Sequence, residues 1–185
     1  MLKLNFHLSM AFGAIRKIPA AVKRWHLALA AIVAALFSSV AVATPGSGIV
    51  SAPIQARASF VDPTGVKFTI KGPNPKVIEV NNAQENVIQQ IVIAPGGATG
   101  WHSHPGPVVV LIKSGQMSFY DGDSPTCTAR TYTAGQAFID VGQGHVHIAR
   151  NESATENLEL WATYFDVPAG GVFRIDAPNP GTCSF

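Results

Sequence analysis

The sequence predicts a single all-β domain behind an N-terminal leader, and three observations support this fold class. Short runs of β-branched and aromatic residues recur between turn signals rich in Gly, Pro, Asn and Asp. No segment after residue 44 shows a sustained 3.6-residue hydrophobic period with helix caps. The 185 residues are enough for one ordinary domain with a core, but not for two. A β-sandwich or β-barrel is therefore expected.

The first 43 residues differ from the rest of the chain. They hold five of the 13 basic residues, none of the 11 acidic ones, and the apolar run LALAAIVAALF at residues 27–37. A basic stretch, an apolar run and small residues ending in Ala43 are typical of a secretory signal peptide cleaved after that residue. The alternative is an uncleaved membrane anchor, because residues 25–43 form a largely apolar stretch of 19. Cleavage predicts a secreted or periplasmic protein that does not associate with a membrane.

After residue 43, the chain contains 8 basic and 11 acidic residues, a net charge of −3. This mild acidity, without a basic cluster, gives no electrostatic reason to expect nucleic acid as a partner. Both cysteines, Cys127 and Cys183, lie in the exported part. An even pair in an oxidising compartment predicts a disulfide, which would tie the C-terminal tail to the domain. A reactive or metal-binding thiol is the alternative, although neither cysteine has a histidine nearby in the sequence.

Residues 44–58 are rich in Pro, Gly, Ser and Ala, which predicts an extended N-terminal arm before a barrel domain at 59–185. Nine strands are expected in that domain, at residues 66–70, 76–80, 86–93, 107–113, 116–120, 129–133, 136–141, 145–150 and 157–165. Apolar and other residues alternate in the strands at 116–120 and 157–165, which predicts one buried and one wetter face for each. The run PVVVLIK at 107–113 does not alternate, which predicts burial on both faces.

All four histidines after the leader lie in two pairs with i, i+2 spacing. The pairs are His102 with His104 in GWHSHPGP, and His145 with His147 in GHVHIARN. Alternate residues of a strand project to one side, so each pair presents two imidazoles to the same face. Three imidazoles from two facing segments can surround a divalent ion, and neutral imidazole suits Zn, Cu, Fe and Ni. The alternative is that the histidines only donate and accept hydrogen bonds in a pocket.

The residues around these pairs resemble the two motifs of the cupin superfamily. The spacing G-x5-H-x-H from Gly96 to His104 resembles the first motif, and H-x3-N from His147 to Asn151 resembles the second. The resemblance covers about residues 89–165. It implies a double-stranded β-helix, that is, a jelly-roll barrel, with a metal ion held inside one end. Cupins often dimerise, so a homodimer is also an expectation.

The resemblance implies three ligands for a divalent ion of Fe, Mn, Cu, Zn or Ni, namely His102, His104 and His147. It also implies a glutamate in the first motif, but that position is occupied by Val108. A site of neutral histidines alone leaves the charge of the ion uncompensated, which favours weak binding or a ligand that brings an anion. His145, on the turn before its strand, is a candidate fourth ligand. Gln116 is a candidate residue to contact a water bound at the site.

These residues lead to two functional hypotheses. The first is an exported cupin with a three-histidine metal site that oxidises or otherwise transforms a small anionic molecule, as a dioxygenase-like oxidoreductase does. The second is a non-catalytic barrel that binds a small ligand or sugar and has a degenerate metal site. A structural role at the cell surface, with residues 44–58 as a spacer, is a third. The sequence has no Ser-His-Asp pattern or phosphate loop, so no further catalytic residue is predicted.

Overall fold

The computed structural model describes residues 42–71 and 75–185, which contain strands and turns but no helix. The strands are β1 (Ser47–Ser51), β2 (Ile54–Ser59), β3 (Val66–Ile70), β4 (Lys76–Val80), β5 (Glu85–Ala98), β6 (His102–Ser103), β7 (Val108–Ser114), β8 (Gln116–Asp121), β9 (Arg130–Thr133), β10 (Ala137–Asp140), β11 (His147–Arg150), β12 (Leu158–Val167) and β13 (Ile175–Asp176). The predicted leader at 1–43 lies outside these ranges, apart from its last two residues. Within the described ranges, no helix has the length and apolar character needed to cross a membrane.

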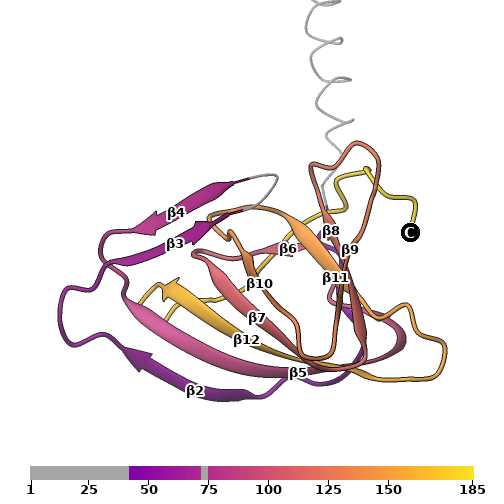
Figure 1. Cartoon of the computed structure of the whole chain (residues 1–185), viewed down its shortest axis with the longest axis horizontal. Helices are drawn as coiled ribbons and strands as arrows, with labels where there is room; N and C mark the ends of the chain where they lie inside the picture. The colour runs from indigo at the N-terminus through magenta and orange to yellow at the C-terminus, as the bar shows by residue number, and fades with distance from the viewer. Residues whose placement is uncertain (1–41, 72–74) are drawn as a thin grey trace, which may run out of the picture. The chain divides into compact units, whose positions relative to one another are not determined.

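Eleven strands form one antiparallel sheet that curves into a nearly closed barrel (Figure 1). The order along the sheet is β10-β7-β12-β5-β11-β6-β13, while β1 and β2 also pair with β5 and β8 pairs with β11 and β9. The ribbon of β3 and β4 forms a separate two-stranded sheet. The 14-residue strand β5 pairs with β12 along most of its length and with β11 at Ala98. The predicted all-β barrel is therefore confirmed.

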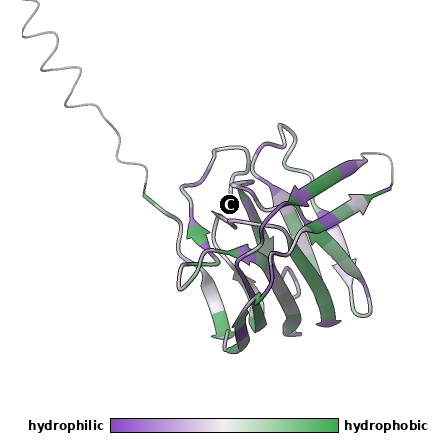
Figure 2. Cartoon of the chain, turned by 90° about the vertical axis from the view of Figure 1, so that its left-hand side faces the viewer, coloured by the Kyte–Doolittle hydropathy of each residue, from purple (hydrophilic) through white to green (hydrophobic). Residues whose placement is uncertain are grey.

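The barrel interior is the main hydrophobic core, and apolar segments run along most of its strands in Figure 2. On β12 every second residue is buried, at Leu158, Leu160, Ala162 and Tyr164, which confirms the alternation predicted for this strand. These side chains pack against those of β5, β7 and β8. Since a fully buried Leu contributes about 1.5–3 kcal/mol, this layer is a major source of stability.

The structure corrects two predictions about strand faces. On β8, Ser118 and Tyr120 are buried as well as the core residues, because both hydroxyls donate hydrogen bonds to Glu152 and Tyr120 packs on Phe185 of the C-terminal tail. The wetter face predicted for this strand is therefore covered. On β7, Leu111 is 46% exposed, so burial on both faces is wrong. The inner face of β7 is buried, whereas its outer face ranges from half-buried at Val109 to exposed at Leu111.

The segment predicted as an extended N-terminal arm contains β1 and β2, and both strands pair with β5. All side chains of the two strands are exposed. Backbone hydrogen bonds hold this segment on the sheet, together with side-chain contacts from Arg57 and Ser59 to Glu85, rather than a buried apolar face. A sequence pattern of buried positions cannot reveal such a strand, because pairing uses backbone groups that every residue except proline supplies.

The disulfide between Cys127 and Cys183 is confirmed, with the Cα atoms 5.2 Å apart. It ties the C-terminal tail over a second hydrophobic cluster on the outside of the barrel. The ring of Phe185 stacks on Trp101 of this cluster, and the guanidinium of Arg150 lies 4.0 Å from the centre of the Phe185 ring. Trp101 immediately precedes β6, so the tail supports the segment that carries the first histidine pair.

Candidate metal centre

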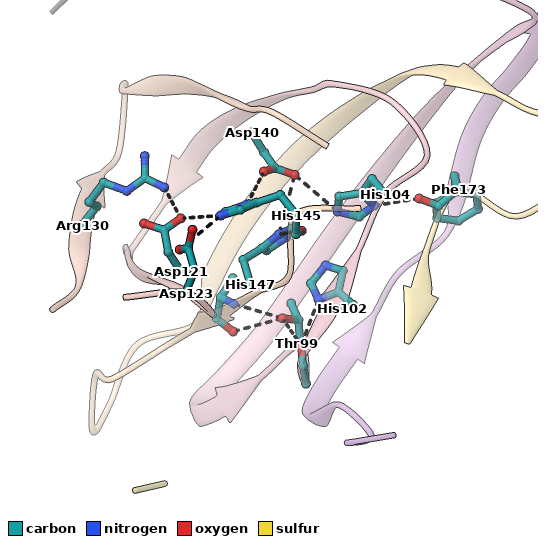
Figure 3. Close-up of polar contacts among 12 residues, drawn as sticks. Thr99, His102, His104, Asp121, Asp123, Arg130, Asp140, His145, His147 and Phe173 are labelled. Carbon is teal, nitrogen blue, oxygen red and sulfur yellow. Dashed lines mark hydrogen bonds and ion pairs between the residues drawn. The ribbon is translucent and has the colours of Figure 1, made fainter. Parts of the chain in front are cut away.

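The two histidine segments are neighbours in the barrel. β6 pairs with β11 so that His102 lies directly opposite His147. Opposite residues of an antiparallel pair point to the same side of the sheet, and His104 follows His102 by two residues. The ring centres lie 4.3 Å apart for His102 and His147, 4.8 Å for His102 and His104, and 5.1 Å for His104 and His147 (Figure 3). The structure therefore brings together the three histidines that the cupin resemblance implies, here called the histidine cluster.

The turn that follows His104 and the turn that precedes His147 are in direct backbone contact. Gly142 has a φ of 60°, and a Cβ at this position would lie 1.8 Å from the carbonyl oxygen of Gly106. Only glycine permits both this backbone conformation and this approach. In addition, the amide of Gly144 donates a hydrogen bond of 3.1 Å to the carbonyl of His104. The turn before His147 is thus held against the turn that follows His104.

A backbone carbonyl lies beside one nitrogen of each imidazole in the histidine cluster. The Nδ1 atoms of His102, His104 and His147 lie 2.9, 2.7 and 3.3 Å from the carbonyl oxygens of Gly100, Phe173 and His145. A carbonyl oxygen only accepts hydrogen bonds, so each contact places the proton on Nδ1 and leaves the lone pair on Nε2. Histidines that bind metals through Nε2 are oriented in the same way.

The histidine cluster is buried, and each of its side chains belongs to a residue no more than 5% exposed. Burial is the main cause that lowers the pKa of His104 to about 4 and that of His102 well below its usual range. Burial also lowers the pKa of His147. All three imidazoles are therefore neutral at pH 7, which is the protonation state that a metal ion requires.

A carboxylate missing from the sequence motif is supplied by a neighbouring strand. Asp140 on β10 lies directly opposite Val108 on β7, the position where the cupin resemblance implies a glutamate. Opposite residues share a face, so Asp140 points into the same interior as Val108. Its Oδ2 atom lies 3.9 Å from Nε2 of His104 and 3.7 Å from Nδ1 of His147 (Figure 3). The histidine cluster therefore has an adjacent carboxylate after all.

The state of Asp140 indicates that it belongs to a site for a cation. The residue is 3% exposed, and Oδ2 has no hydrogen-bond partner among the described residues. An unpaired buried carboxylate oxygen is costly unless a cation or a water compensates it. Burial raises the pKa of Asp140, but the positive charges that His147, His145 and His104 carry when protonated lower it more, so the pKa lies below its usual value. Three imidazoles with a carboxylate beside them fit a divalent ion.

His145 does not join the histidine cluster. It forms a second close group with Asp140 and His147, and its Nδ1 lies 3.6 Å from Oδ1 of Asp140. Its other ring nitrogen faces outward, 3.3 Å from Asp121 and 3.8 Å from Asp123 (Figure 3). The neighbouring Asp140 is the main cause that raises the pKa of His145. His145 therefore connects the buried carboxylate to acidic groups near the surface, and it is placed beside the cluster rather than in it.

The structure does not bring Gln116 to the histidine cluster. Gln116 is exposed at the start of β8, where it lies opposite Thr133 of β9, whereas Asp121 at the other end of β8 lies opposite His147. Five residues of extended strand separate the two ends, a distance of roughly 16 Å. The suggestion that Gln116 contacts a water at the site is therefore wrong, because its position after a turn glycine says nothing about which end of the barrel it occupies.

Two cavities meet at the histidine cluster. An inner cavity of about 40 Å³ is lined by all three histidines and by Asp140, which is enough space for an ion or a water. An outer cavity of about 390 Å³ is also lined by His102 and His104, and by Tyr164. A volume of this size is at the lower end for small-molecule sites. A group bound in the outer cavity would therefore share two of its neighbours with an ion in the inner one.

Comparison with known proteins gives only distant similarities. No family model and no curated protein matches the chain. One similar solved structure is an uncharacterized conserved protein with a double-stranded beta-helix domain from Klebsiella pneumoniae, with 18% identity, coverage of 61% of this chain and 84% of that one, and a TM-score of 0.41. Another is a cupin domain from Bordetella pertussis, with 19% identity, coverage of 57% of this chain and 97% of that one, and a TM-score of 0.38. The polyketide cyclase RemF from Streptomyces resistomycificus is 17% identical, with coverage of 42% of this chain and a TM-score of 0.37. This chain spans 52% of the length of that protein.

Sequence reasoning missed one residue of this barrel that carried a usable signal. Asp140 is the only charged residue in the strand predicted at 136–141, between Ile139 and Val141. A carboxylate in an apolar strand is buried only when a partner compensates its charge. Its assignment to the histidine cluster, however, requires the pairing of β10 with β7, which the local sequence does not specify.

Proposed function

We propose that this chain is an exported, cupin-like protein that binds a divalent metal ion and transforms a small anionic molecule. The observation that carries the proposal is the histidine cluster: three buried imidazoles that converge beside a carboxylate, where an inner and an outer cavity meet. The metal can be Fe, Mn, Cu, Zn or Ni, since all of these accept imidazole and carboxylate ligands.

In this proposal, His102, His104 and His147 hold the ion through Nε2. When bound, such an ion supplies Lewis-acid or oxygen-activating chemistry. The carbonyl contacts at Nδ1 keep the rings in the orientation that binding requires, so little side-chain freedom is lost on binding. Asp140 balances only part of the charge of a divalent ion, and this favours a substrate that brings a negative charge of its own.

The proposed export is supported by the disulfide. Disulfides persist in secreted and periplasmic proteins and are rare where thiols are kept reduced. Removal of the predicted leader after Ala43 would leave Thr44 as the first residue, and its nitrogen, an amide in the full chain, would become an α-amino group 3.0 Å from the carbonyl oxygen of Ala177. Amino-terminal sequencing of the protein recovered from its native host is the direct test of cleavage at this position.

Elemental analysis of the purified protein tests the metal site. The wild-type protein, reconstituted anaerobically with each of the five metals, is expected to retain one ion per chain. The His104→Ala variant is expected to lose it, because this change removes one of three ligands. His145→Ala is the matched control, since this histidine lies outside the cluster, and it is expected to keep the ion. Oxygen-uptake assays on small diketones, thiols and phenols then test for catalysis.

Other outcomes of this experiment have clear meanings. If His145→Ala loses the ion while His104→Ala keeps it, the ion is held by the group of Asp140, His145 and His147 instead. If neither the wild-type protein nor any variant binds a metal, the metal-dependent activity is excluded. The non-catalytic alternative, in which the barrel binds a small ligand or sugar through hydrogen bonds, would then be favoured.

The change Asp140→Asn is expected to weaken metal binding by about ten- to a hundredfold, as for other groups that support metal-binding histidines. The substitution keeps the shape of the side chain but removes its charge beside His104 and His147. Asp123→Asn is the control, because the side chain of Asp123 is 81% exposed and lies 3.8 Å from His145, outside the histidine cluster. Competition titrations with a zinc-sensitive chelating dye measure both affinities. Equal affinities of Asp140→Asn and wild type would show that Asp140 has no role at the ion.

A further inference from the structure

The outer cavity is bordered by a cation that the sequence reasoning did not single out. Arg174 directly precedes β13, which pairs with β6 so that Asp176 lies opposite His102. The preceding carbonyl, that of Phe173, orients the His104 ring. The backbone on either side of Arg174 is thus attached to both histidines of the first pair, and its side chain lines the same cavity as they do.

The guanidinium of Arg174 is held in place but keeps free donors. Nε donates to Oδ1 of Asp176 at 2.6 Å, and Nη2 donates to the carbonyl of Thr99 at 2.7 Å. Among the described residues, Nη1 has no hydrogen-bond partner. A guanidinium with two fixed nitrogens and a free third one is preorganised, so it loses little entropy when it binds an anion.

Charge and shape of the cavity specify the kind of anion. Asp176 already compensates much of the charge on Arg174, which favours a singly charged group over a dianion such as phosphate. The rest of the wall includes Ile49, Ile91 and Phe173, so it also accommodates a short apolar group.

We propose that Arg174 binds the carboxylate of a small monocarboxylate whose short apolar part lies in the outer cavity, toward the histidine cluster. This inference rests on the proposed function and makes it more specific, since it names the chemical class of the anion and the residue that selects it. Arg174 is a binding and specificity residue, whereas the histidines remain the groups that would hold the ion.

Propionate and its neutral isostere propionamide are suitable probes. Chemical-shift titrations of isotope-labelled protein, with and without bound zinc, measure the affinity for each. Hydrogen bonds from a charged donor contribute about 1.5–3 kcal/mol, so Arg174→Gln is expected to weaken propionate binding by about ten- to a hundredfold. Arg174→Lys keeps the positive charge but not the planar guanidinium with its several donors, so its affinity for propionate is expected to lie between those of wild type and Arg174→Gln. Propionamide is expected to bind weakly to all forms.

Two further variants separate this effect from a loss of structure. Asp176→Asn removes the anion that competes for Arg174, so it is expected to tighten propionate binding by about two- to fivefold. Misfolding would not produce an effect in this direction. Arg130→Gln removes an arginine that pairs with Asp121 outside the outer cavity, and it is expected to leave propionate binding unchanged.

Metal content measured on the same samples distinguishes the two proposals. Propionate binding that depends on Arg174 in a protein that holds no metal would support the inference and exclude the metal-dependent function. If the Arg174→Gln and Asp176→Asn variants retain the metal and both bind propionate with the affinity of the wild-type protein, the inference is overturned but the proposed function is not. Equal binding of propionate and propionamide by the wild-type protein would overturn it too.

Discussion

Replacement of both Cys127 and Cys183 by serine is expected to lower the free energy of unfolding by about 4 kcal/mol. The disulfide joins residues 56 positions apart, and closing a loop of this length removes that much conformational entropy from the unfolded chain. For a domain of this size, the melting temperature should fall by about 8–16 °C. Guanidinium unfolding of the oxidised wild type, the reduced wild type and the double variant gives the three free energies.

A second variant separates the covalent link from the packing of the tail. Phe185→Ala keeps the disulfide and removes the ring that lies against Trp101, Tyr120 and Arg150. Phe185 is 42% exposed, so its loss should cost only about 1 kcal/mol. If the double serine variant is no less stable than Phe185→Ala, the chain-entropy explanation is incorrect.

The metal-free protein is expected to lose stability as the pH falls from about 6.5 to 4. In the unfolded chain, His104 binds a proton below its usual pKa of 6.5, whereas burial in the folded protein lowers this pKa to about 4. Between these values the unfolded state binds more protons, so the free energy of unfolding falls with falling pH. His104 alone accounts for a loss of about 3 kcal/mol at pH 4. His102 and His147 are shifted in the same direction and increase the loss.

Urea unfolding at pH 7, 6, 5 and 4.5, with a chelator present throughout, measures this dependence. The His104→Gln variant is the control. Glutamine does not titrate, so the slope of the free energy of unfolding against pH should fall by the equivalent of up to one bound proton. Stability that stays constant between pH 7 and 5 would contradict the prediction that the cluster is buried in the neutral form. Added zinc should raise stability at pH 7 and lose this effect toward pH 5, where protons compete for the same nitrogens.

Much of the strand layout could be predicted because buried strands leave a local pattern. The strands expected at residues 66–70 and 76–80 have the bounds of β3 and β4, and the alternation at 157–165 identified the buried face of β12. The exposed strands β1 and β2 leave no such pattern. The covered outer face of β8 was also unpredictable, because the tail that covers it is more than 50 residues away in the sequence and is attached by the disulfide.

By itself, the sequence determined that the chain has an all-β domain, and it favoured a disulfide between the two cysteines and a first histidine pair, His102 and His104, on one face. Only the tertiary structure decided which groups surround them. Asp140 and Arg174 lie 36 and 70 positions from His104, yet strand pairing places the first beside the histidine cluster and the second at the outer cavity. The side-chain period of two is a local property of a strand, whereas the register between strands follows from burial of the whole barrel interior.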